Sequence, residues 1–291
     1  MMEQPVAQAH AIEEEGLSSR DFTRLRELIH VETGICLSPE KKTMVEVRLK
    51  RRLRILNMAT YNDYCEFVFG RKGMKEELIH LIDVITTNKT DFFREPAHFE
   101  FLAQKALPEL AVNGRPFLAW SAGCSIGEEP YTMAMVLSEF AESHPGFRFR
   151  IWATDISTAV LEKAQLGIYA SETIAPVPLA LKRKYLLRSR DSKSSRVRVV
   201  PEIRKLIEFR RLNFIDSDYA LAERADVIFC RNVLIYFDRA TQESILRKLV
   251  HDLTPGGYLF VGHSETLHDM ALPVVPVAPA LYRKAYARTR N

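Results

Sequence analysis

The chain has 291 residues, of which 47% are hydrophobic, so it can hold one large domain or two modest ones with a real core. Its formal net charge is only +4, from 41 basic and 37 acidic residues, which argues against a general nucleic-acid coat. The four cysteines are far apart without a C-x-x-C pair, and no apolar run approaches the ~20 residues that cross a bilayer. We therefore expect a protein of the reducing cytoplasm, without a zinc site, a disulfide scaffold or a signal peptide.

The first third of the chain has helical spacing. Residues 1–17 have no periodic apolar face and predict a mobile tail. From residue 18 to 85 apolar residues recur at helical intervals, with Ser18 as a capping residue and Gly34 as a helix stop. The pattern predicts a small four-helix bundle, whose helices begin near residues 18, 38, 60 and 72.

The second expected helix carries an unusual density of basic residues. At 100° per residue, four of them fall opposite the apolar stripe of Val45, Leu49 and Leu53: Arg48, Lys50, Arg51 and Arg54. Most such runs are solvated helix faces. The same face would also suit docking of an acidic partner, either protein or nucleic acid, and the residues alone leave both interpretations open.

Residues 86–96 interrupt the helical pattern with polar residues beside two adjacent aromatics. A plain linker would not need Phe92 and Phe93, so we interpret the segment as a linker that also lines a site. Its candidate ligand contacts are Asn88, Thr90 and Arg94, the last of which could hold a carboxylate in a bidentate fork. The alternative is an ordinary structured loop.

Residues 117–131 predict a buried strand, a turn of small residues and a helix, which is how a nucleotide-binding α/β unit begins. The dinucleotide fingerprint G-x-G-x-x-G is absent. Glu128 and Glu129 occupy the place where a pyrophosphate needs bare N–H groups, so the turn suits a ligand with a positive end. S-adenosylmethionine is such a ligand, because it has a sulfonium, an ammonium and no phosphate. Stabilisation of the helix N-terminus by the two acids is the other interpretation.

The residues after this motif continue an α/β pattern. Residues 147–154 predict a second strand that ends at Asp155, where an acid can bind ribose hydroxyls. An aspartate after a strand is also often a helix cap. Residues 179–188 look helical, and the alternation in 196–199 and 206–212 predicts a small antiparallel β insert around 190–212.

Further polar residues follow the later strands. Val227 to Cys230 predicts a buried strand, and ligands of open α/β sheets bind at the carboxyl ends of strands. Candidate site residues at such ends are Asn213, Phe214, Arg231, Asn232 and Tyr236. A helix over 238–253, a strand over 258–261 and a last, edge strand from Leu281 complete the pattern. His263 could act as a ligand or base, although a loop histidine is more often structural.

The residues quoted above resemble those of the CheR-type chemotaxis receptor methyltransferases. The resemblance runs from about residue 18 to 287, in the order of five stretches: Thr86–Glu95, Ser121–Tyr131, Ala153–Ile156, Phe229–Phe237 and Gly262–Glu265. It implies an all-α domain over 18–85, then an α/β, class I (Rossmann-like) methyltransferase domain with seven strands over 97–291. It also implies S-adenosylmethionine as methyl donor, S-adenosylhomocysteine as product, no metal, and methylation of receptor glutamates as a protein-glutamate O-methyltransferase.

The resemblance further implies roles for individual residues. Asn88, Thr90 and Arg94 would touch the cofactor from the linker, while Glu129 and Asp155 would hold its charged end and its ribose. Its adenine and methionine sides would meet Asn213, Phe214, Arg231 and Asn232. Arg94 and Tyr236 would be nearest the transferred methyl, and the basic helix (Arg48, Lys50, Arg51 and Arg54) would dock the acidic helical bundle of the receptor. The expected protein is a cytoplasmic monomer recruited to membrane receptor arrays.

One departure and two alternatives accompany this expectation. Some members of the family hold a receptor's C-terminal pentapeptide through a glycine-bearing loop of the insert, but residues 189–195 contain no glycine, so we expect weak or no binding of that tail. A nucleic-acid methyltransferase could share the domain, although no aromatic-flanked base pocket is visible. A receptor-binding adaptor with weak activity is the second alternative.

Overall fold

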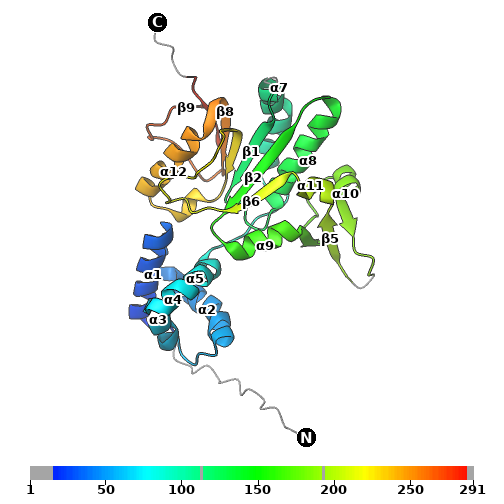
Figure 1. The fold of residues 1–291 in the computed structure, drawn as a ribbon. Helices are drawn as coiled ribbons and strands as arrows, with labels where there is room; N and C mark the ends of the chain where they lie inside the picture. The colour runs from blue at the N-terminus through cyan, green and yellow to red at the C-terminus, as the bar shows by residue number, and fades with distance from the viewer. Residues whose placement is uncertain (1–15, 112–113, 192–193, 287–291) are drawn as a thin grey trace. The chain divides into compact units, whose positions relative to one another are not determined.

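The computed structural model describes residues 16–111, 114–191 and 194–286, which form two compact units (Figure 1). The first unit ends at Thr87 and the second begins at Asn88, inside the expected linker. We call them the helical unit and the sheet unit. The expected tail, residues 1–17, lies outside the described residues except for Gly16 and Leu17, and Leu17 is buried.

The helical unit contains short helices with defined caps. Ser18 accepts a hydrogen bond from the N–H of Asp21 at 3.0 Å, and Gly34 ends the first helix with φ of 73°. Val45, Leu49 and Leu53 are fully buried, as their spacing predicts. The elements are α1 (Ser19–Thr33), the 3-10 turn η1 (Pro39–Lys41), α2 (Lys42–Leu56), α3 (Tyr61–Phe69), α4 (Arg71–Glu76) and α5 (Leu78–Ile85).

The helix predicted over 72–85 is in fact two helices, α4 and α5, that meet at Glu77. The Glu77 carboxylate is buried, pairs with Arg52 at 2.6 Å and accepts from the Tyr64 hydroxyl at 3.0 Å. A Cβ on Gly73 would collide with the carbonyl of Phe67, so α4 packs against α3 through bare backbone. The spacing of apolar residues does not reveal the break at Glu77, because buried residues on both sides of it belong to the core of the same unit.

The sheet unit is built on a seven-stranded sheet in the order β6-β2-β1-β7-β8-β10-β9. The first five strands are parallel to one another, and the last two are antiparallel to their neighbours. This confirms the expected α/β class. The strands are β1 (Phe117–Ala122), β2 (Phe149–Asp155), β6 (Ile207–Arg211), β7 (Ala225–Cys230), β8 (Leu253–Val261), β9 (Val274–Ala278) and β10 (Leu281–Lys284).

Helices contact the sheet and close its core. Phe229 of β7 stacks on Phe260 of β8 at 4.1 Å between ring centroids and on Phe99 at 5.5 Å. Ser157 and Gly167 cap α9 as predicted. The helical segments are α6 (Pro96–Phe101), the π-type η2 (Leu102–Ala106), α7 (Leu107–Leu110), α8 (Glu128–Ser143), α9 (Thr158–Leu166), α10 (Leu179–Tyr185), α11 (Pro201–Arg204), the 3-10 turn η4 (Leu234–Tyr236) and α12 (Arg239–His251).

The antiparallel insert exists, but its predicted extent is wrong. It consists of β3 (Ile168–Ala170), β4 (Leu186–Arg188) and β5 (Arg196–Val199), in the order β3-β5-β4. Residues 206–212, predicted to belong to it, contain β6, which pairs in parallel with β2 of the large sheet. The strand from Leu281 was predicted to be an edge strand. This is wrong, because this strand, β10, lies between β8 and β9 in the sheet. Alternation indicates a half-exposed strand but does not indicate its neighbour.

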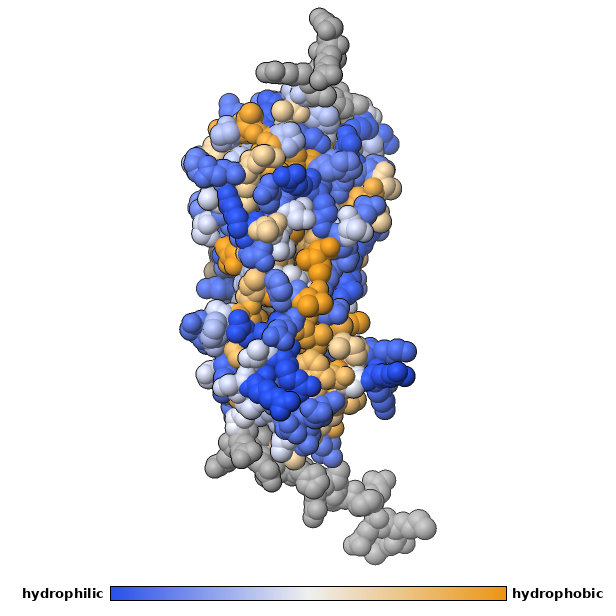
Figure 2. Space-filling view, turned by 90° about the vertical axis from the view of Figure 1, so that its left-hand side faces the viewer, coloured by the Kyte–Doolittle hydropathy of each residue, from blue (hydrophilic) through white to orange (hydrophobic). Residues whose placement is uncertain are grey.

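The surface mixes polar and apolar side chains. The face drawn in Figure 2 is largely hydrophilic with hydrophobic residues among the hydrophilic ones. Exposed apolar residues occur on both units, for example Val47 and Ile55 on α2 and Leu179 on α10. Among the described residues, no helix combines the length and the apolar character that a membrane span requires.

Candidate functional site

The carboxyl ends of β1, β2 and β7 meet where the strand order reverses, the usual ligand site of an open α/β sheet. All six residues of β1 are buried, and the turn after it is tied to β2 by hydrogen bonds from the N–H groups of Gly123 and Cys124 to the Thr154 carbonyl, at 2.8 and 2.9 Å. Gly123 has φ of 90°, and a Cβ there would collide with Val233 in the loop after β7. This glycine therefore lets two loops of the site touch.

Asp155 ends β2 and is bound to the same turn. Its two oxygens accept from the N–H of Ser125 at 2.9 Å and from the N–H of Ser157 at 3.0 Å. Ser125 has a left-handed φ of 50°, which directs its N–H to the carboxylate. The predicted ribose-binding acid thus also fixes the turn after β1, and it remains half-exposed.

The first residues of the sheet unit join this site. The Ser125 hydroxyl donates to the carbonyl of Asn88 at 2.9 Å. Phe92 is fully buried and meets the Tyr169 ring edge-on at 5.0 Å, while the N–H of Phe93 donates to the Thr132 hydroxyl at 3.2 Å. The two aromatics therefore anchor the segment that carries Asn88, Thr90 and Arg94 to α8 and to β3 of the small sheet.

A buried charge network, formed by Glu95, Glu129 and Arg231, lies at the centre of the site. Arg231 has only 1% of its side chain exposed, and it contacts a carboxylate oxygen of Glu95 and one of Glu129, each at 3.2 Å. It also donates to the main-chain carbonyl of Arg94. The hydroxyl of Ser121 donates to the other oxygen of Glu129 at 2.7 Å. The network joins the ends of β1 and β7, the start of α8 and the loop before α6.

The two carboxyls in this network have opposite pKa shifts. Burial raises the pKa of Glu129 above its ordinary value, and the opposing effects of Arg231 and Ser121 do not cancel it. Burial also acts to raise the pKa of Glu95, but Arg231 and the N–H of His263 outweigh burial and hold that pKa below its ordinary value. Within the network the positive charge of Arg231 therefore outweighs burial at Glu95 but not at Glu129.

Glu265 organises the loops after β7 and β8. Its buried carboxylate accepts from the N–H groups of Asn232 at 2.9 Å, Leu234 at 2.8 Å, Ile235 at 3.3 Å and Gly262 at 2.6 Å. Asn232 has a left-handed φ of 57° within this arrangement. Glu265 has no predicted role, although it lies in the Gly262–Glu265 stretch. Glu95 and Ser121 were likewise missed as site residues, because nothing in their neighbourhoods in sequence indicates Arg231.

The remaining predicted residues lie on loops at the same end of the sheet. Asn213 is half-buried and accepts from the N–H of Ile215 at 3.4 Å, and Phe214 is buried with its carbonyl accepting from the Tyr219 hydroxyl at 3.0 Å. Both follow β6. Tyr236 follows β7 and is half-buried at the end of η4. Thr90 is half-buried between Asn88 and Phe92.

Three further ionisable groups of the sheet unit have unusual environments. Burial, followed by the charge of Arg231, lowers the pKa of His98 to about 4, so its ring is neutral at pH 7. The His263 ring lies edge-on to His98 at 5.2 Å between centroids and is exposed. Burial raises the pKa of Glu128 to about 7, and one of its oxygens has no hydrogen-bond partner among the described residues.

The basic face of α2 is smaller than predicted. Arg48 is half-buried and donates to the carbonyls of Val84 at 3.2 Å and Ile85 at 2.9 Å in α5, and to that of its C-cap residue Thr86 at 2.9 Å. Arg48 is therefore a C-cap for α5, a role that helical periodicity cannot reveal. Lys50, Arg51 and Arg54 are exposed and have no ion pair among the described residues.

Comparisons with known proteins agree with this architecture. Residues 20–86 match the family description "CheR methyltransferase, all-alpha domain", and residues 88–277 match "CheR methyltransferase, SAM binding domain", which supports S-adenosylmethionine as the cofactor. A chemotaxis protein methyltransferase of Borreliella burgdorferi is 39% identical over 92% of this chain and 95% of its own. Chemotaxis protein methyltransferase 2 of Pseudomonas aeruginosa is 39% identical over 91% and 93%, and a chemotaxis protein methyltransferase of Escherichia coli K12 is 40% identical over 87% of each chain. The chain belongs to the CheR methyltransferase family.

Proposed function

We propose that this chain transfers the methyl group of S-adenosylmethionine to γ-carboxylates of glutamates on chemoreceptors and gives glutamate methyl esters. The observation that carries the proposal is the buried Arg231 between Glu129 and Glu95 at the carboxyl end of the sheet. The site has buried carboxylates, and the turn after β1 lacks the glycine pattern that binds a pyrophosphate. Both features suit a positively charged sulfonium cofactor. The names of the relatives that match over most of the chain support a chemoreceptor as acceptor.

The residues of the site fit this cofactor. Glu129 is the partner for the cofactor's ammonium group, because a positive charge beside this carboxylate stabilises its ionised form against the effect of burial, which raises its pKa. Asp155, already oriented by Ser125 and Ser157, is the partner for the ribose hydroxyls. The linker residues Asn88 and Thr90, the adenine-side residues Asn213 and Phe214, and Asn232 beside Arg231 complete the binding set.

The reaction needs positioning more than acid–base catalysis. When bound, the cofactor supplies an activated methyl group on its sulfonium. A glutamate with pKa ~4.3 is already ionised at pH 7, so the enzyme has no proton to remove. The protein has to desolvate the acceptor carboxylate and hold one of its oxygens in line with the methyl group and the sulfur.

Arg94 and Tyr236 are the groups that we assign to this positioning. One nitrogen of Arg94 donates to the Lys89 carbonyl at 3.2 Å, and a guanidinium has five N–H donors, so this bond leaves capacity for a carboxylate. Tyr236 adds a hydroxyl from the loop that Glu265 fixes. Arginine and tyrosine together could hold both oxygens of one carboxylate.

The assignment is tested by separating turnover from cofactor affinity. Arg94→Ala and Tyr236→Phe should each lower turnover on a chemoreceptor cytoplasmic fragment by roughly tenfold or more, with S-adenosylhomocysteine affinity changed far less. Lys89→Ala removes an exposed charge from the same loop and should leave both quantities near wild type. Wild-type turnover in both site variants would refute the assignment, while loss of S-adenosylhomocysteine affinity alone would make them cofactor ligands.

Lys50, Arg51 and Arg54 form the receptor-docking face in this proposal, since the receptor segments to be methylated are acidic. Reversing all three charges to Glu should raise the KM for the receptor fragment and weaken its salt dependence, without changing S-adenosylhomocysteine affinity. An unchanged KM at low ionic strength would leave the face as ordinary solvated surface.

A further inference from the structure

Two histidines without a part in the proposed transfer meet Glu95 at the edge of the charge network. Glu95 directly precedes α6, His98 lies in the first turn of that helix, and His263 follows β8. Oε2 of Glu95 is 3.4 Å from Nδ1 of His98 and 4.0 Å from Nε2 of His263. The three potential ligand atoms all lie within 4.8 Å of one another.

His98 has an unusual position for a polar side chain. Only 4% of its side chain is exposed, and neither ring nitrogen makes a hydrogen bond of good geometry among the described residues, although the main-chain carbonyl of Pro279 faces the ring. Nδ1 approaches the Glu95 carboxylate outside hydrogen-bonding geometry, while the ring packs edge-on against Phe260 at 5.5 Å. Buried polar groups in proteins are nearly always paired, so Nδ1 of this ring, which faces the Glu95 carboxylate, is available to a ligand.

We propose that Glu95, His98 and His263 bind a divalent transition metal ion of the zinc type. Two imidazole nitrogens and one carboxylate oxygen form a donor set that zinc takes with water in an open fourth position. Mg²⁺ and Ca²⁺ prefer all-oxygen sites and find only one carboxylate here.

The geometry needs a small adjustment on one side only. Tetrahedral zinc with bonds of about 2.0–2.1 Å places its ligand atoms about 3.4 Å apart. The Glu95–His98 pair already has this separation, so most of the movement falls to His263. His263 has 56% of its side chain exposed at the start of the loop after β8, where such a movement meets little resistance and water can supply the fourth ligand.

Arg231 sets the strength of the site. Its guanidinium lies 3.2 Å from the same Glu95 oxygen that faces both histidines, so the ion has to share this carboxylate with a buried positive charge. Affinity is therefore lower than in a closed structural zinc site, and binding is reversible. The expectation of no zinc site rested on cysteine spacing, and the expectation of no metal on the family resemblance. Neither considers ligands that the fold gathers from the segment before α6 and the loop after β8.

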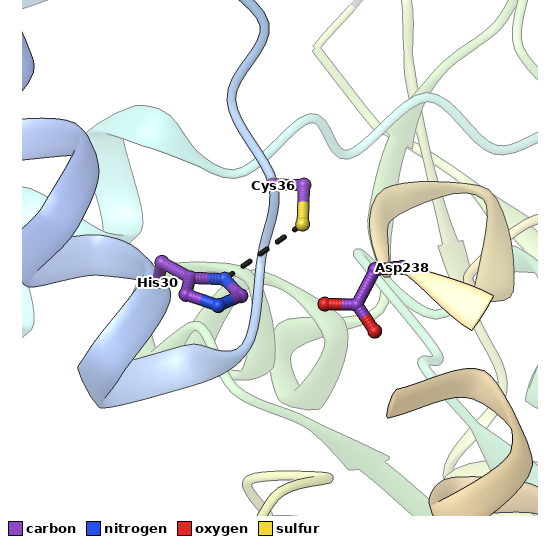
Figure 3. Close-up of side chains that lie close together, drawn as sticks. All are labelled: His30, Cys36 and Asp238. Atoms are coloured by element: carbon purple, nitrogen blue, oxygen red, sulfur yellow. Dashed lines mark hydrogen bonds between the residues drawn. The ribbon is translucent and has the colours of Figure 1, made fainter. Parts of the chain in front are cut away.

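The test uses Co²⁺ as a spectroscopic probe on the full chain without an affinity tag. In the helical unit, Sγ of Cys36 lies 3.7 Å from Nδ1 of His30, and these two atoms could also bind a metal ion (Figure 3). Every protein in the series therefore carries Cys36→Ser, which removes this competing thiol. Co²⁺ should produce the visible absorption of a four- or five-coordinate ion at one equivalent per chain. Zn²⁺ should then displace it.

Variants decide whether the three residues are the ligands. His263→Ala, at an exposed position, should weaken Co²⁺ binding by roughly tenfold or more, and His98→Gln should do the same with unfolding monitored by tryptophan fluorescence. His268→Ala removes a more exposed histidine five residues on and should leave the affinity unchanged. No absorption change, wild-type affinity in His263→Ala, or an equal loss in His268→Ala would each overturn the proposal.

Discussion

The buried Glu128 should make the stability of the sheet unit fall as the pH rises. Its pKa is raised from 4.5 to about 7 by burial, so the folded chain keeps a proton that the unfolded chain has already lost in this window. The free energy of unfolding therefore decreases between pH 4.5 and 7 and does not recover above pH 7. Glu128→Gln keeps the shape but cannot ionise, so it lacks this slope.

The magnitude follows from the shift in pKa. A shift of 2.5 units corresponds to about 3 kcal/mol, of which about 2–3 kcal/mol develops between pH 5 and pH 8. The difference in unfolding free energy, variant minus wild type, should rise by that amount over this range. The slope of the difference is the informative quantity, because an unpaired amide at this position has its own pH-independent cost.

Urea unfolding at pH 5, 6, 7 and 8 measures this difference. The chain has two tryptophans, Trp120 on β1 and Trp152 on β2, so their fluorescence reports the unit that contains Glu128. Glu162→Gln, at an exposed position on α9, is the matched control and should track wild type at every pH. A variant-minus-wild-type difference that stays constant with pH, or that falls as pH rises, would refute the reasoning.

Three further predictions concern carboxylates and a cap. Glu129→Gln should weaken S-adenosylhomocysteine binding by roughly tenfold or more in calorimetry, because it removes the charge that Arg231 and an ammonium group share. Glu265→Gln should weaken the same binding and lower the melting temperature, since an amide nitrogen would face backbone N–H donors; wild-type affinity would show that the loops do not need this carboxylate. Arg48→Ala should destabilise the helical unit by about 1–3 kcal/mol in circular dichroism, whereas the exposed Lys50→Ala should change it by less than about 0.5 kcal/mol. Equal effects of the last two substitutions would contradict the capping role of Arg48.

Local patterns predicted the elements of this fold well. The strand, turn and helix of residues 117–131 are β1 and α8. Ser18 and Ser157 cap the starts of helices and Gly34 caps the end of one, as expected. Each of these depends on neighbours in sequence. The large sheet and the all-α unit agree with the resemblance drawn from five short motifs.

Features that depend on distant partners were predicted poorly. Residues 206–212 alternate as any half-exposed strand does, and only the pairing with β2 places them in the large sheet. Arg48 lies on the polar side of its helix, yet three carbonyls at the end of α5 bind it. The same limit applies to the site, where Glu95 and Glu265 act on Arg231 and on the loop after β7 through contacts that the sequence does not indicate.

Methylation of receptor carboxylates is the activity that we propose for this chain. Incubation with methyl-labelled S-adenosylmethionine and a chemoreceptor cytoplasmic fragment, with RNA as a parallel acceptor, tests it most directly. We predict label on the receptor fragment that mild base releases as methanol, which identifies carboxyl methyl esters. Base-stable label on the receptor fragment, or label on RNA instead, would contradict the account.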